Sequence, residues 1–173
     1  MSSFKDRIIR AAWLDVNLYE EVEADKGAMG QAVGVVVLSS IAAGIGSIGI
    51  GGIVGILIGT IGALVGWYIW AYLTYFIGTK FLPEPETRSD SGEMLRTIGF
   101  SSSPGLIRIL GIIPGLTKVI FLLSTIWMLV AMVVAVRQAL DYKSTVRAFV
   151  VCLIGWIIQM LIVWLVFFIF RWP

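Results

Sequence analysis

The chain has 173 residues, of which 58% are hydrophobic and only 14% charged, and its mean hydropathy is +0.94. Soluble domains are about 45–50% apolar and about 25% charged, so the composition indicates an integral membrane protein. The net charge of +2 is small and its basic residues are scattered, so we expect no nucleic-acid partner. The chain has no histidine and one cysteine, Cys152. We therefore predict no catalytic residue, no metal site and no cofactor.

Residues 1–28 predict a cytoplasmic amphipathic segment. One broad helical face carries Phe4, Ile8, Ile9, Ala12, Trp13 and Val16, and the opposite face carries Asp6, Arg7 and Arg10. This pattern favours a helix lying along the membrane surface with its apolar face toward lipid. The alternative is a soluble helix packed on the loops. We interpret the acidic residues that follow as a solvated helix face: Glu20, Glu21, Glu23 and Asp25.

Residues 29–173 predict an all-α domain of five transmembrane helices. About 20 helical residues cross a bilayer core, and apolar runs of this kind lie near 29–50, 53–77, 94–115, 119–136 and 148–170. The third run is the weakest, because GFSSSPGLIRILGIIPG carries three serines, two prolines and an arginine.

We expect Pro104 to kink the third helix and Pro114 to end it. The hydroxyls of Ser101, Ser102 and Ser103 would then bond carbonyls that Pro104 leaves free. The alternative is a protein of four crossings, in which the third segment is re-entrant.

Lysine and arginine residues predict the orientation. With five crossings, one side carries Lys5, Arg7, Arg10, Lys26, Lys80, Arg88, Arg137, Lys143 and Arg147. The other side carries only Arg108, Lys118 and Arg171. Because cytoplasmic segments are richer in basic residues, we expect a cell-membrane protein with its N-terminus cytoplasmic and its C-terminus outside.

Glycines recur at helical spacing in the second apolar run, at Gly51, Gly55, Gly59, Gly62 and Gly66. Small residues at this spacing let helix backbones approach closely within a membrane. We favour packing of the first two helices against each other. The alternative is an interface with a membrane-protein partner or a second copy of the chain.

Three basic residues are candidates for interfacial or lipid-headgroup contacts: Lys80, Arg96 and Arg108. A charge inside a crossing is costly, but Arg96 and Arg108 lie near opposite ends of the third segment. Long basic side chains reach an interface from such positions. We therefore predict anchoring roles for these residues.

Several passages together resemble the Yip family, the Ypt/Rab-interacting integral membrane proteins, and more closely its uncharacterised bacterial branch. These passages are RIIRAAWLDVNLYEEVEAD, GQAVGVVVLSS, GFSSSPGLIRILGIIP and IWMLVAMVVAVRQALDYKSTVRAFVVCLIGW. The resemblance implies five helices, a cytoplasmic N-terminus and no agreed enzymatic activity. Eukaryotic members are linked to Rab GTPases through a long cytoplasmic region. In this chain the corresponding cytoplasmic region is reduced to residues 1–28. We therefore do not extend the GTPase interaction to this chain.

The leading functional hypothesis is a non-enzymatic scaffold, assembly factor or accessory subunit of a membrane complex. A small transporter or channel using the broken third segment is one alternative. A lipid-binding, membrane-organising protein is the other. The partners expected are membrane lipids and either membrane proteins or further copies of the chain.

Overall fold

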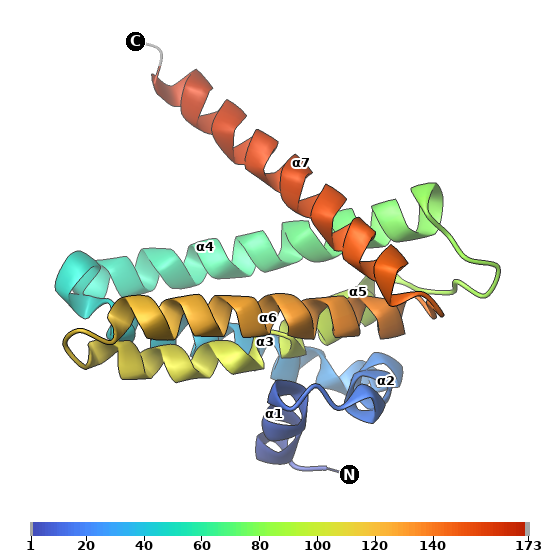
Figure 1. The fold of residues 1–173 in the computed structure, drawn as a ribbon, viewed down its shortest axis with the longest axis horizontal. Helices are drawn as coiled ribbons and strands as arrows, with labels where there is room; N and C mark the ends of the chain where they lie inside the picture. The colour runs from blue at the N-terminus through green and yellow to red at the C-terminus, as the bar shows by residue number, and fades with distance from the viewer. Residues whose placement is uncertain (1, 172–173) are drawn as a thin grey trace.

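The computed structural model describes residues 2–171, in which every regular element is a helix (Figure 1). The α-helices are α1 (Phe4–Ala12), α2 (Val16–Ala24), α3 (Met29–Gly46), α4 (Ile48–Phe76), α5 (Ser91–Phe100), α6 (Thr117–Ala139) and α7 (Thr145–Arg171). Two 3-10 helices, η1 (Lys26–Ala28) and η3 (Ser103–Ile112), and a π-helix, η2 (Ile77–Phe81), complete the order. The all-α prediction is confirmed. The predicted domain of residues 29–173 extends two residues beyond the described range, since 172–173 lie outside it. The predicted location of the C-terminus therefore also falls outside the described residues.

Within this range, four helical stretches are long and apolar enough to cross a membrane. They are Lys26–Gly46, Gly51–Phe81, Thr117–Ala139 and Thr145–Leu165. The shortest has 21 residues, which is about 30 Å at about 1.5 Å per residue. The break expected after the first span is present, since Gly52 has a φ of +57°, a backbone conformation that glycine adopts readily.

The third apolar segment is two short helices, so the predicted single kinked span is not confirmed. Pro104 lies in the first turn of η3, where its missing N–H removes no bond within η3, although Pro104 cannot continue the hydrogen bonding of α5. The hydroxyl of Ser103 donates to the carbonyl oxygen of Phe100, which Pro104 leaves free, over 2.7 Å. Ser101 donates likewise to Ile98, over 2.7 Å. The expectation that a serine satisfies a carbonyl that Pro104 leaves free is met by Ser103. Ser101 bonds a carbonyl six residues before Pro104, which the missing N–H does not affect.

Helix η3 packs against α3 and α6 (Figure 1). The contact with α3 is close because glycines line it. A Cβ added at Gly46 would lie 1.9 Å from the carbonyl oxygen of Arg108, and one at Gly105 would lie 2.1 Å from Oγ of Ser39. Glycines of α3 and η3 therefore permit this close approach of helix backbones.

Helices α1 and α2, here called the cap, pack against one side of the bundle, toward the end at which α6 finishes (Figure 1). The Arg7 side chain is 4% exposed and pairs with Glu21 and Asp25 at 2.9 and 2.8 Å. These two carboxylates therefore hold α1 against α2 instead of belonging to a purely solvated face. The indole of Trp127 on α6 donates to the carbonyl oxygen of Ala12 over 2.8 Å, which fixes the end of α1 to the bundle.

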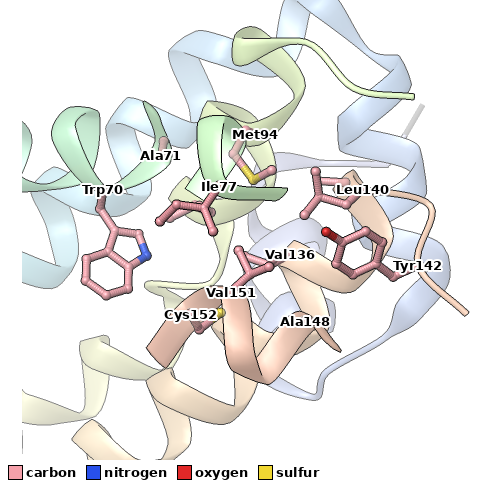
Figure 2. Close-up of a cluster of buried hydrophobic side chains, with 12 residues drawn as sticks. Trp70, Ala71, Ile77, Met94, Val136, Leu140, Tyr142, Ala148, Val151 and Cys152 are labelled. Carbon is pink, nitrogen blue, oxygen red and sulfur yellow. The ribbon is translucent and has the colours of Figure 1, made fainter. Parts of the chain in front are cut away.

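A cluster of buried side chains joins α4, α5, α6 and α7 at the same end of the bundle (Figure 2). Tyr142, in the connector before α7, donates to the carbonyl oxygens of Gly78 and Leu82 over 3.0 and 2.7 Å. These bonds tie the connector to the π-helix. The C-terminal part of α7 diverges from α4 and α6 toward the other end (Figure 1).

Candidate functional site

A cavity of about 560 Å³ lies within the helical bundle. Its walls come from α3, α4, α5, η3, α6 and α7, and one side is formed by Gly55, Gly59 and Gly66 of α4. A Cβ at Gly55 or Gly59 would meet nothing within 4 Å, and one at Gly66 would meet only Nε2 of Gln159 at 3.9 Å. The volume falls within the range of small-molecule sites. These glycines therefore leave room beside α4.

Arg108 supplies the charge in this cavity. Its Nε donates to Oγ of Ser124 over 2.8 Å, and its Nη2 donates to Oγ1 of Thr125 over 2.9 Å. Its guanidinium carbon lies 5.4 Å from the ring centroid of Phe121. Throughout residues 2–171, no ion pair to Arg108 is present. The guanidinium is held by neutral groups and an aromatic face alone.

Two further polar side chains of the cavity wall carry a buried atom without a partner. Trp70 is 8% exposed, and neither its Nε1 nor Oε1 of Gln159 has a hydrogen-bond partner among the described residues. Leaving such a group unpaired costs about 1–3 kcal/mol. Figure 2 shows Trp70 at the edge of the buried cluster, with most of its labelled members to one side. The cavity wall thus combines apolar surface with buried polar atoms that lack a hydrogen-bond partner.

The glycines predicted on α4 divide into two sets. Gly55, Gly59 and Gly66 line the cavity, whereas Gly51 and Gly62 lie outside its lining and have nothing within 4 Å of an added Cβ. Helices α3 and α4 instead meet through other residues. Ser40 donates to Oγ1 of Thr60 over 3.1 Å, and an added Cβ at Gly44 would lie 2.6 Å from the Ile56 side chain.

The structure does not bring the three predicted basic residues together. Arg96 is 4% exposed, and its Nε donates to the carbonyl oxygen of Val22 over 2.9 Å. Its Nη2 also donates to the carbonyl oxygen of Glu23. Lys80 is exposed in the π-helix at the cap end. Among these three residues, only Arg108 lines the cavity.

Pro114 lies outside the cavity, in the turn between η3 and α6. Its neighbour Gly115 has a φ of +85°, which suits a reversal of chain direction. Within residues 2–171, no group of three or more His, Cys, Asp or Glu side chains is placed to hold a metal ion.

Sequence reasoning missed the serines of α3 as members of a site. Ser39 and Ser40 of α3, and Ser47 directly after its last residue, line the same cavity as Arg108. Hydroxyls on an apolar helix opposite a glycine-rich helix are the signal that could have indicated it. The position of Gln159, on a helix far along the chain, carries no such signal.

The fold and its cavity define a multi-pass helical membrane protein with a partly polar site inside its bundle. A family model described as the Yip1 domain matches residues 20–167. The chain therefore belongs to the Yip family. No curated protein and no solved structure matches it.

Proposed function

We propose that this protein is a non-enzymatic, lipid-binding member of the Yip family that organises the membrane around it. A lipid or related amphiphile from the bilayer occupies the cavity beside α4. One observation carries the proposal. The guanidinium of Arg108, which has no ion pair among the described residues, lies in a cavity of about 560 Å³ with largely apolar walls, one of them formed by glycines. An amphiphile offers polar and apolar groups to both kinds of surface.

The placement in the membrane that we propose has five traversals. Helix α5 has 10 residues and η3 has 10, or about 15 Å and about 20 Å of helix. Together they lie along the length of α3 and α6 (Figure 1). A fifth traversal made of these two helices is consistent with these lengths.

The connections support the same topology. At the cap end, the connector before α7 meets the 82–90 loop, since Arg147 donates to the carbonyl oxygen of Pro83 over 2.8 Å. The turns at Gly52 and Gly115 lie at the opposite end (Figure 1). Most basic residues belong to segments at the cap end. We therefore propose that the cap end is cytoplasmic, in the cell membrane.

A scaffold or accessory subunit is the second candidate function. The outward face of α4 favours it, because Ile53, Val54 and Leu57 are 73%, 65% and 61% exposed. A helix of another membrane protein would cover this face. Such a partner would remain bound in stoichiometric amounts when the protein is purified from its own membrane in a mild detergent.

Lipid retention tests the leading proposal. Wild-type protein and a Gly59→Leu variant are purified from the same membranes and analysed by native mass spectrometry. Leucine at residue 59 fills the cavity, so the variant should lose a lipid that the wild type retains. The matched control is Gly62→Leu, because Gly62 has the same open surroundings on α4 but lies outside the lining.

Equal lipid retention by the Gly59→Leu and Gly62→Leu variants would overturn the assignment of the cavity. A wild-type protein that carries no lipid and gains no thermal stability from added lipid would overturn the function itself. A stoichiometric protein partner found in the same experiment would favour the scaffold. Solute flux in proteoliposomes that Gly59→Leu abolishes would favour a transporter.

A further inference from the structure

We propose that the ligand is an anionic amphiphile whose headgroup binds Arg108, entering from the leaflet away from the cap, with its acyl chain along the glycine wall of α4. This inference rests on the proposed function, which places a lipid in the cavity. It adds the charge of the ligand, its orientation and its leaflet.

The charge follows from the partners of Arg108. Ser124 and Thr125 accept hydrogen bonds from the guanidinium, and each hydroxyl in turn donates to the carbonyl oxygen of Phe121, over 3.0 and 2.7 Å. Both partners are neutral, so they orient the guanidinium without balancing its charge. An uncompensated charge inside a membrane is costly, and a phosphate or carboxylate binds guanidinium through short charge-assisted bonds.

The chain has no acidic residue available to Arg108. All 11 Asp and Glu residues lie between residues 6 and 25, between 84 and 93, or at 141. These segments belong to the cap, the 82–90 loop with the start of α5, and the connector before α7, all at the cap end of the bundle (Figure 1). Within residues 2–171 no carboxylate pairs with Arg108, so a balancing negative charge would come from another molecule.

The leaflet follows from the position of Arg108 along the bundle. A Cβ at Gly46, the last residue of α3, would lie 1.9 Å from the carbonyl oxygen of Arg108. Arg108 is four residues from the end of η3, which is about 8 Å at about 2.0 Å per residue. It is thus nearer the end that holds the Gly52 and Gly115 turns than the cap. A headgroup reaches it from the leaflet at that end.

The acyl chain has a largely apolar path from this point. The lining residues of α4 run from Gly55 to Trp70, which is about 22 Å of helix. Ala63 of α4 and, from facing elements, Ile98 and Met132 give this path its apolar surface. The path ends at the ring of Trp70, so that a bound chain would approach this indole.

Charge selectivity is the first test. Purified protein in a neutral detergent is titrated with phosphatidylglycerol and with phosphatidylcholine of identical acyl chains, and binding is measured by native mass spectrometry. We expect the anionic lipid to bind about tenfold tighter or more, since hydrogen bonds to charged groups contribute about 1.5–3 kcal/mol. The preference should disappear in Arg108→Gln and remain in Arg108→Lys. Inorganic phosphate should not displace the lipid, because it has no chain to occupy the cavity.

The control for surface charge is Lys118→Gln, because Lys118 is exposed in the first turn of α6 and does not line the cavity. Circular dichroism confirms that each variant remains helical. An equal loss of preference in Lys118→Gln would overturn the inference. Equal binding of both lipids that Gly59→Leu abolishes would also overturn it, while leaving the proposed function standing. No binding of either lipid would overturn the proposed function.

Orientation is the second test. Phosphatidylglycerol brominated near the middle of its chains should quench the fluorescence of wild-type protein more than that of Trp70→Phe. The difference should vanish in Arg108→Gln. Identical quenching of wild type and Trp70→Phe would contradict the proposed path of the chain. The leaflet from which the lipid binds is tested in vesicles that contain phosphatidylglycerol in one leaflet only. Binding from the cap side alone would contradict the assigned leaflet.

Discussion

The Nε of Arg96 donates a 2.9 Å hydrogen bond to the carbonyl oxygen of Val22, which joins the third apolar segment to the last turn of α2. A second bond from the same guanidinium reaches the carbonyl oxygen of Glu23. The last carbonyls of a helix lack partners within it, and a cation there also interacts favourably with the helix dipole. Arg96 therefore acts as a C-terminal cap supplied by a distant part of the chain.

Replacing Arg96 with methionine should destabilise the protein by about 1.5–3 kcal/mol, the range for hydrogen bonds to charged groups. Thermal unfolding in detergent measures the loss, and limited proteolysis should show earlier cleavage before residue 29. Arg88→Met is the control, because Arg88 is exposed in the 82–90 loop. Equal melting temperatures for Arg96→Met and the wild type would contradict the capping role.

Removing the Arg7 side chain should loosen α1 from α2. Exposed ion pairs contribute about 0–1 kcal/mol and breaking a buried pair costs about 3–5 kcal/mol. Arg7 is 4% exposed, but its partners Glu21 and Asp25 are 32% and 34% exposed, so we expect Arg7→Met to cost about 2 kcal/mol. Hydrogen exchange of the α1 amides measures the opening. Lys5→Met, at an exposed position on the same helix, should leave that exchange unchanged.

The raised pKa of the Glu23 carboxyl should make the stability of the protein depend on pH. Burial of its carboxyl raises its pKa from an ordinary 4.5 to about 8, and repulsion from Asp141, Glu93 and Glu20 adds to this, against a smaller opposing effect of Arg96. Because the pKa is higher in the folded protein, this group favours folding at pH below 4.5. That stabilisation is lost as the pH rises through about 8.

The measurement compares the melting temperatures of wild type and Glu23→Gln from pH 5 to pH 9. The wild type should lose stability relative to the variant as the pH rises. Glu20→Gln, at an exposed position of the same helix, is the control and should alter the profile much less. Parallel profiles for wild type and Glu23→Gln would show that the carboxyl does not titrate in this way.

Adding one methyl group should separate glycines that pack closely from those that do not. At Gly46 the new Cβ would lie 1.9 Å from a backbone oxygen, whereas at Gly62 it would meet nothing within 4 Å. Gly46→Ala should therefore destabilise the protein by about 1–3 kcal/mol or more. Gly62→Ala should not destabilise the protein, because alanine within a helix is favoured over glycine by about 0.5–1 kcal/mol. Thermal unfolding of the two variants side by side checks the contrast, and equal melting temperatures would contradict the close contact of α3 with η3.

Five traversals predict a simple pattern of labelling. In a Cys152→Ala background, single cysteines at Arg88 and Lys143 should react with a membrane-impermeant thiol reagent from the cytoplasmic side. A cysteine at Pro114 should react only from the opposite side. If Pro114 and Arg88 are labelled from the same side, the third segment is re-entrant and the protein has four traversals.

The amino-acid sequence by itself determined the class of this protein, because long apolar runs have few structures open to them in a bilayer. It also indicated an interruption between the first two apolar runs, where Gly52 lies, and the role of Ser103, since each depends on local backbone chemistry. The single kinked helix predicted at Pro104 is two short helices in the structure. Family membership likewise followed from the order of several passages along the chain.

The tertiary structure alone decided how distant residues meet. Arg96 and Arg108 lie 12 positions apart on one segment, yet one caps α2 and the other lines the cavity. The spacing of the glycines on α4 predicts a helix-packing face, but several of them border open space. Such outcomes depend on which helix lies opposite each residue, and a helical spacing along the sequence specifies a face without specifying what that face contacts.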